Sequence, residues 1–151
     1  MSLQDLLEQQ RLQPYRVSAQ EMADLWAVVD GSLDDAQVES ISLDLRFSAA
    51  YDAALTLATM ALRCAGFRTR GVAHHATAFE GMALVLGPEY QPQADLFEAC
   101  RIKRNVSHYR RRGQVMQQEL RELLAVTQQF REQLQGWMRE HFPEFAPATP
   151  Q

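Results

Sequence analysis

Apolar residues in the last third of the chain recur at steps of three and four, which is the spacing of one face of an α-helix. The steps run from Leu120 to Met138 and stop before Pro143. β-branched residues are few, and no stretch alternates apolar and polar residues for more than about five positions. We therefore expect an all-α protein without strands.

The segment from Ser42 to Arg63 is apolar on most of its sides and contains Phe47 and Tyr51. A helix of that composition is normally buried on most sides, so this segment is the predicted central helix. Short connections predict an up-and-down bundle of about four to five main helices. Two helices are expected before the central one: a short opening helix that ends near Pro14, and a helix from a capping box at Ser18–Glu21 to about Gln37. Three are expected after it: a helix over His74–Leu86, a helix that starts near Pro92, and the final helix.

No repeat or linker divides the chain of 151 residues. We expect residues 1–145 to form one domain and residues 146–151 to form a disordered tail. The longest apolar run, Ala53–Leu62, already includes two threonines and is too short to cross a bilayer. The N-terminus lacks the features of a secretory signal. Cys64 and Cys100 fall in apolar helical patterns, which predicts core thiols in a cytoplasmic protein without a membrane partner.

Positive charge is concentrated in residues 101–113, here called the basic segment. It holds six Lys or Arg residues and one His, and no acid occurs between Glu98 and Glu119, in a chain of net charge −4. This distribution predicts a local contact with an anion rather than general nucleic-acid binding. If the preceding helix continues through the segment, one side carries the apolar residues Leu96, Ala99, Ile102 and Val106, with Tyr109 at its margin. The opposite side, which faces away from the core, carries Arg101, Asn105, His108 and Arg112, with Arg104 at its edge.

These residue types are suited to chemistry on RNA. Cleavage through the 2′-OH without a metal needs a group that moves a proton and a cation that stabilises charge at phosphorus. His108 suits the first role, and Arg101 and Arg104 suit the second. Arg and His at helical spacing also occur by chance, so a solvated basic face stays an alternative.

From about Ser42 to Trp137 the chain resembles the small bacterial HEPN-domain proteins. The segment LRFSAAYDAALTLATMALRCAGFRTR resembles their long helix, His74 and His75 follow after a short turn, and GQVMQQELRELLAVTQQFREQLQGWM is similar to their closing helix. The stretch RIKRNVSHY resembles the family signature Lys-Arg-Asn-x-x-x-Tyr, carried here by Lys103, Arg104, Asn105 and Tyr109.

The resemblance implies an up-and-down helical bundle that is often homodimeric. Catalytic members are metal-independent endoribonucleases with an Arg-x(4–6)-His motif, commonly in toxin–antitoxin or phage-defence systems, and some are paired with a small nucleotidyltransferase. Arg101 and His108 match that spacing. The toxin pattern Arg-Asn-x-x-x-His-x-Tyr is not matched, because only two residues separate Asn105 from His108. The candidate residues are Arg101, Arg104 and His108 for catalysis and Lys103, Asn105, Tyr109 and Arg112 for binding.

Three functions follow as hypotheses. The chain could bind RNA, a nucleotide or another anion without turnover, it could be a metal-independent endoribonuclease, or it could be a structural bundle without a ligand. Expected partners are a second copy of the chain, RNA or a nucleotide, and a nucleotidyltransferase or antitoxin protein. No cofactor is expected.

Two further pairs of residues lie outside these motifs. His74 and His75 have no Cys or carboxylate at the spacing of a metal site, so we expect capping or packing and no metal. Tyr51 and Asp52 could supply a counter-charge to the basic segment, or Tyr51 could be a core residue with a bonded hydroxyl.

Overall fold

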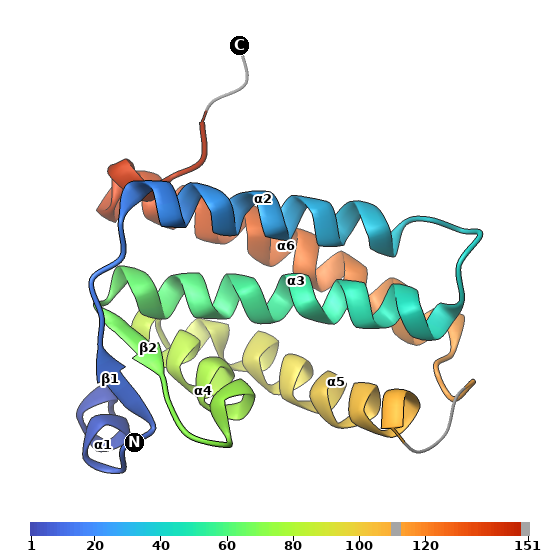
Figure 1. Ribbon diagram of the computed structural model, residues 1–151, viewed down its shortest axis with the longest axis horizontal. Helices are drawn as coiled ribbons and strands as arrows, with labels where there is room; N and C mark the ends of the chain where they lie inside the picture. The colour runs from blue at the N-terminus through green and yellow to red at the C-terminus, as the bar shows by residue number, and fades with distance from the viewer. Residues whose placement is uncertain (110–112, 149–151) are drawn as a thin grey trace.

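A computed structural model describes residues 1–109 and 113–148, with the side chains of residues 1–105 and 113–148. The longest helices, α2, α3, α5 and α6, alternate in direction along the chain (Figure 1). The predicted all-α bundle is confirmed. Its described helices are α1 (Leu3–Glu8), α2 (Ala19–Ala36), α3 (Leu43–Cys64), α4 (His74–Leu86), α5 (Gln91–Tyr109) and α6 (Gln117–His141), with the 3₁₀ turns η1 (Pro88–Tyr90) and η2 (Pro143–Phe145).

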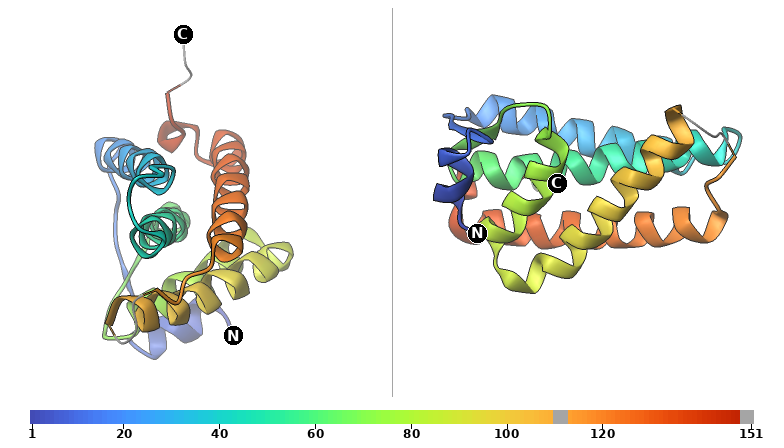
Figure 2. Two further views of the ribbon diagram at one scale, coloured as in Figure 1. Left: turned by 90° about the vertical axis from the view of Figure 1, so that its right-hand side faces the viewer. Right: turned by 90° about the horizontal axis from the view of Figure 1, so that it is seen from below.

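Helix α3 lies at the centre of the bundle and contacts α2, α4, α5 and α6 (Figures 1 and 2). It begins after Ser42, whose Oγ accepts a hydrogen bond from the N–H of Leu45. Phe47 and Tyr51 are completely buried or nearly so. The central helix predicted from Ser42 is therefore confirmed. Aromatic rings in ring-to-ring contact connect α3 to α6 through the core, in the order Tyr51, Phe79, Phe97 and Phe130.

Helices α4 and α5 pass beneath α3 and α6 and are joined by η1 (Figure 2). Helix α4 has the bounds that the sequence predicts, His74–Leu86. It packs so closely on α3 that a Cβ atom at Gly81 would lie 2.6 Å from Cδ2 of Leu62. Helices α4 and α5 both pack on α3 and also contact each other.

Two short strands, β1 (Leu12–Pro14) and β2 (Phe67–Thr69), pair in an antiparallel sheet. The expectation of no strands is therefore wrong, and the opening helix ends at Glu8 rather than near the predicted proline. Gly66 turns the chain after α3 with a φ of +93°, and its carbonyl accepts a hydrogen bond from the N–H of Tyr15. Strands of three residues that pair over such a sequence distance are too short to show an alternating pattern.

The N-terminus of α2 confirms half of the predicted capping box. Ser18 Oγ accepts a hydrogen bond from the N–H of Glu21. The carboxylate of Glu21 does not return to the backbone of Ser18, however, because it accepts hydrogen bonds from Tyr15 Oη and Arg63 Nη1. The charged guanidinium is a stronger partner than a backbone N–H, so this side chain joins α2 to α3.

The C-terminal residues of the described chain pack against the bundle. Trp26 Nε1 donates a hydrogen bond to the carbonyl of Phe145 at 2.9 Å, and Ala146 contacts the core. Residues 149–151 of the predicted tail lie outside the described residues. Cys64 and Cys100 are free and buried, which confirms the predicted core thiols. No described helix combines the length and the apolar character needed to cross a membrane.

Candidate functional site

The described part of the basic segment on α5 has a different orientation from the predicted one. Ile102, expected in the core, is 54% exposed. Arg101 and Arg104, expected to face away from the core, are partly buried on the side of α5 that faces α3 and α4. Phe97 is fully buried and defines the core side of α5. Arg101 and Arg104 follow it by four and seven residues and therefore share its face.

Arg104 extends from α5 to α3. Its Nε donates a hydrogen bond to Ser48 Oγ at 3.3 Å, and its Nη2 lies 3.9 Å from Oδ1 of Asp52. The guanidinium carbon is 5.4 Å from the ring centre of Tyr51, which is a cation–π distance. Asp52 is thus a counter-charge to Arg104, as one of the two hypotheses for Tyr51 and Asp52 predicted.

Tyr51 joins α3 to the first turn of α4. Its hydroxyl lies 2.9 Å from Nδ1 of His75, so the buried, bonded tyrosine of the other hypothesis is confirmed as well. Burial raises the pKa of Tyr51, which keeps the phenol protonated. Burial, together with His74, Arg104 and Arg101, lowers the pKa of His75, which favours the neutral imidazole. If Tyr51 donates to Nδ1, the proton of the neutral ring is on Nε2.

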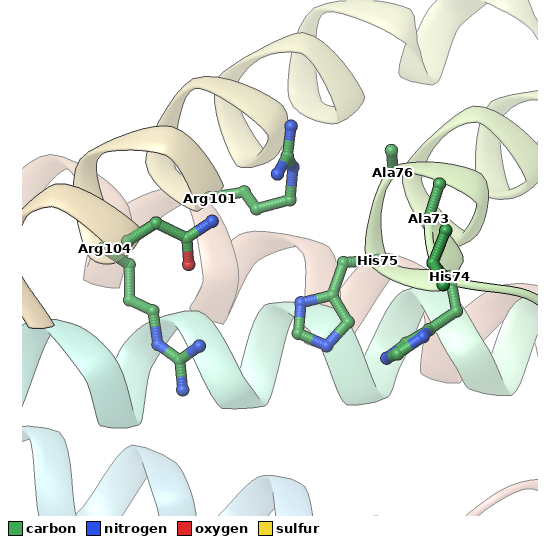
Figure 3. A pocket seen from close by; sticks show the side chains of 8 residues that line it. Ala73, His74, His75, Ala76, Arg101 and Arg104 are labelled. Carbon is green, nitrogen blue, oxygen red and sulfur yellow. The ribbon is translucent and has the colours of Figure 1, made fainter. Parts of the chain in front are cut away.

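His75, Arg101 and Arg104 line one pocket of about 280 Å³ between the start of α4 and the middle of α5. Figure 3 shows Arg104 reaching from α5 toward α3 and the ring of His75 lying in the space between α4 and α5. Helix α4 starts here without a side-chain cap from the described residues, so its first peptide N–H groups add partial positive charge. The full lining consists of Val72, Ala73, His74, His75, Ala76, Arg101, Arg104 and Asn105.

The basic segment lacks acids in sequence, but carboxylates approach it in space. Arg101 Nη2 lies 2.6 Å from Oε1 of Glu98, and this hydrogen bond raises the pKa of Arg101. Lys103 Nζ lies 3.3 Å from Oε1 of Glu119 on α6 and borders a separate cavity. Each of the three described cations of the segment therefore has a carboxylate within 4.0 Å, and two of the three share the pocket.

The structure brings together only some of the predicted site residues. Arg101, Arg104 and Asn105 line the pocket, whereas Lys103 does not. The side chains of His108 and Tyr109, and the whole of Arg112, lie outside the described residues.

His75 was not predicted as a site residue, because its expected role was capping or packing. Its neighbours in the site, Tyr51 and Arg104, are distant in sequence and come from two other helices. No spacing rule for a single helix could have linked the three. Among the described side chains, no three His, Cys, Asp or Glu residues lie together in a way that could hold a metal ion.

The pocket offers donors that are suited to an oxyanion. A guanidinium presents a planar fork of N–H groups that matches two oxygens of a phosphate, and the amide of Asn105 and a protonated Nε2 of His75 could add single hydrogen bonds. Partial burial strengthens such contacts relative to open solvent. No protein-family model, curated protein or solved structure matches this chain, so the geometry of the pocket is the basis for a functional proposal.

Proposed function

We propose that this protein binds a phosphate group of a nucleotide or an RNA in the pocket between α4 and α5, without turnover. The proposal is supported above all by one observation. Arg101 and Arg104 on α5 and His75 on α4 line a single pocket, although the chain as a whole is acidic. Two cations on one wall of the pocket attract an anion locally, while the net negative charge of the chain disfavours anion binding elsewhere on the surface.

The carboxylates next to these arginines are compatible with binding. The ion pair of Arg101 with Glu98 joins side chains that are 29% and 35% exposed, and pairs of that kind contribute little to stability. A guanidinium has five N–H donors, so an incoming phosphate can share or replace the carboxylate. Asp52 and Ser48 orient Arg104 from the α3 side, which reduces the entropy lost when a ligand binds.

Metal-independent cleavage of RNA is the second candidate function, because His75 stands beside both arginines. In such a reaction the imidazole accepts the proton of the 2′-OH as the 2′-oxygen bonds to phosphorus, the P–O5′ bond breaks, and the leaving 5′-oxygen takes a proton from water. The hydrogen bond with Tyr51 decides whether His75 can do this. While Nδ1 accepts from Tyr51, Nε2 carries the ring proton and has no lone pair for a second one, so the base role needs the other tautomer, in which Nδ1–H donates to the Tyr51 oxygen.

The resemblance to HEPN-domain proteins adds further parts to the proposal. It supports a cytoplasmic homodimer and a protein partner of the nucleotidyltransferase or antitoxin class. It also leaves a role for His108, Tyr109 and Arg112, which follow the described part of the basic segment in sequence.

One experiment separates binding from cleavage. A short single-stranded RNA with a labelled 5′-phosphate is incubated with the protein in EDTA, and both filter retention and RNA length are measured. We expect retention that decreases as salt increases and RNA of unchanged length. Cleavage in EDTA that is lost in His75→Gln would favour the enzyme. If RNA is not retained and no nucleotide raises the melting temperature, the remaining function is structural.

A further inference from the structure

We propose that the pocket takes up a proton together with its anion, that His75 receives this proton, and that the preferred ligand is a dianionic terminal phosphate rather than a backbone phosphodiester. This inference rests on the proposed function, because it names the class of phosphate that the same pocket binds.

Among the described side chains, the groups that face His75 come from three helices. The hydroxyl of Tyr51 is 2.9 Å from Nδ1, and the ring centre of His74 is 4.6 Å from that of His75. Arg101 and Arg104 act on the ring from α5 and disfavour the imidazolium, while Glu98 acts in the opposite direction. Asp52 on α3 lies next to Arg104, with Oδ1 3.9 Å from its Nη2.

A bound dianion would reverse the balance of charge at His75. Without an anion, burial, His74 and the two arginines keep the imidazole neutral. An anion between Arg101 and Arg104 offsets their charge at close range, so the free energy of protonating His75 becomes more favourable. Proton and anion then stabilise each other in the pocket, which is thermodynamic linkage.

The Tyr51 hydroxyl can serve both protonation states of His75. Opposite a neutral ring it donates to Nδ1, and opposite an imidazolium it accepts from Nδ1–H after rotation of its own hydrogen. Protonation therefore needs no movement of the heavy atoms of the pair. The charged ring keeps Nε2–H as a donor toward a ligand, now with a full positive charge.

The surface next to the pocket favours a terminal phosphate over an RNA strand whose backbone continues past the pocket. A second cavity of about 120 Å³ adjoins the pocket, and Ala76 lines both. The described part of its lining includes Glu80, Asp95 and Glu98 and no Lys, Arg or His. Although Glu80 and Glu98 are paired with Arg11 and Arg101, this lining offers no cation to a further phosphate, and the carboxylate of Asp95 repels one. A phosphodiester carries one negative charge, whereas a phosphate monoester carries about −1.5 to −2 at neutral pH and stabilises the imidazolium more strongly.

Sulfate is a suitable probe because it is tetrahedral and remains a dianion across the relevant pH range. Calorimetric titrations of the full chain between about pH 8 and pH 5.5 should show tighter binding at lower pH, by up to about tenfold per pH unit for one proton. His75→Gln can keep a hydrogen bond to Tyr51 and should bind sulfate with an affinity that does not depend on pH. His141→Gln, a control histidine in the last turn of α6 that lines neither cavity, should keep the wild-type dependence.

The outcomes distinguish this inference from the proposed function. If sulfate binds but its affinity is independent of pH, or if His75→Gln keeps the wild-type slope, the proton linkage is wrong and the anion site stands. If sulfate does not bind at any pH, the anion site itself is wrong, and the linkage with it. If His75→Gln fails to fold, NMR titration of the His75 ring in the wild type decides, because its pKa must rise when sulfate is added.

The ligand class is tested with methyl phosphate and dimethyl phosphate at neutral pH. The first mimics a terminal phosphate and the second a backbone diester. We expect methyl phosphate to bind roughly tenfold more tightly, because it carries more charge toward the same cations. Equal affinity, or tighter binding of dimethyl phosphate, would contradict the preference for a terminal group.

Discussion

Arg101 and Glu98 lie one turn apart on α5, and the carboxylate of Glu98 accepts hydrogen bonds from Nε and Nη2 of Arg101, the shortest at 2.6 Å. Both donors belong to the fork that would hold a phosphate. Glu98 is therefore an internal competitor for any anion that enters the pocket, and it ties Arg101 to its own helix.

Removal of this competitor should strengthen anion binding. In Glu98→Gln, Arg101 loses a charged partner and the pocket loses a nearby negative charge, so we expect methyl phosphate to bind about three- to tenfold more tightly. Calorimetry measures the change. Asp95→Asn is the matched control, because Asp95 lies on the same helix, accepts a hydrogen bond from Gln91 and makes no pair with Arg101. A gain of the same size in both variants would show that general charge, and not release of Arg101, is the cause.

The position of α4 depends on a close approach at a glycine. In Gly81→Ala the new methyl group would meet the buried side chain of Leu62, so we expect a loss of about 1–3 kcal/mol in the free energy of unfolding. At Gly31 in α2 the same position has no described atom within 4 Å apart from its chain neighbours and its own helix backbone, and Gly31→Ala should gain up to about 1 kcal/mol from helix propensity. Urea unfolding measures both. Stabilisation of similar size in the two variants would contradict the contact between α3 and α4.

The two cysteines should be unreactive in the native protein. Burial raises the pKa of Cys64 and of Cys100 to about 12, with smaller contributions from Glu144 at the first thiol and from Glu122 and Glu119 at the second. At pH 8 roughly one thiol in ten thousand is then a thiolate, the form that reacts. We expect Ellman's reagent to modify neither cysteine until denaturant unfolds the chain. Fast modification of one thiol without denaturant would show that its side of the core opens.

Sequence patterns predicted the helices well, because helical spacing and caps are local. The bounds of α4 and the start of α3 after Ser42 follow from such signals. The pairing of β1 with β2 was not predictable in this way, because it depends on where α3 ends and on the turn at Gly66. Non-local contacts of this kind have no signature in a short window of sequence.

The site was predicted only in part for a similar physical reason. The charge pattern singled out Arg101, Arg104 and Asn105, which the structure places in one pocket. The predicted orientation of these side chains, away from the core, was wrong, because Phe97 rather than Ile102 defines the core side of α5. His75 enters the site through its hydrogen bond to Tyr51 on another helix, which only the tertiary structure reveals.

Lys103 and Arg104 allow the most direct test of the anion pocket, because they are adjacent on α5 and only Arg104 lines the pocket. Calorimetric titration with methyl phosphate should show that Arg104→Gln loses about 10- to 100-fold in affinity, the value of a hydrogen bond to a charged group. Lys103→Gln should stay within about twofold of the wild type. Circular dichroism confirms that both variants are folded. Equal losses in the two variants, or a larger loss in Lys103→Gln, would contradict the assignment of phosphate binding to this pocket.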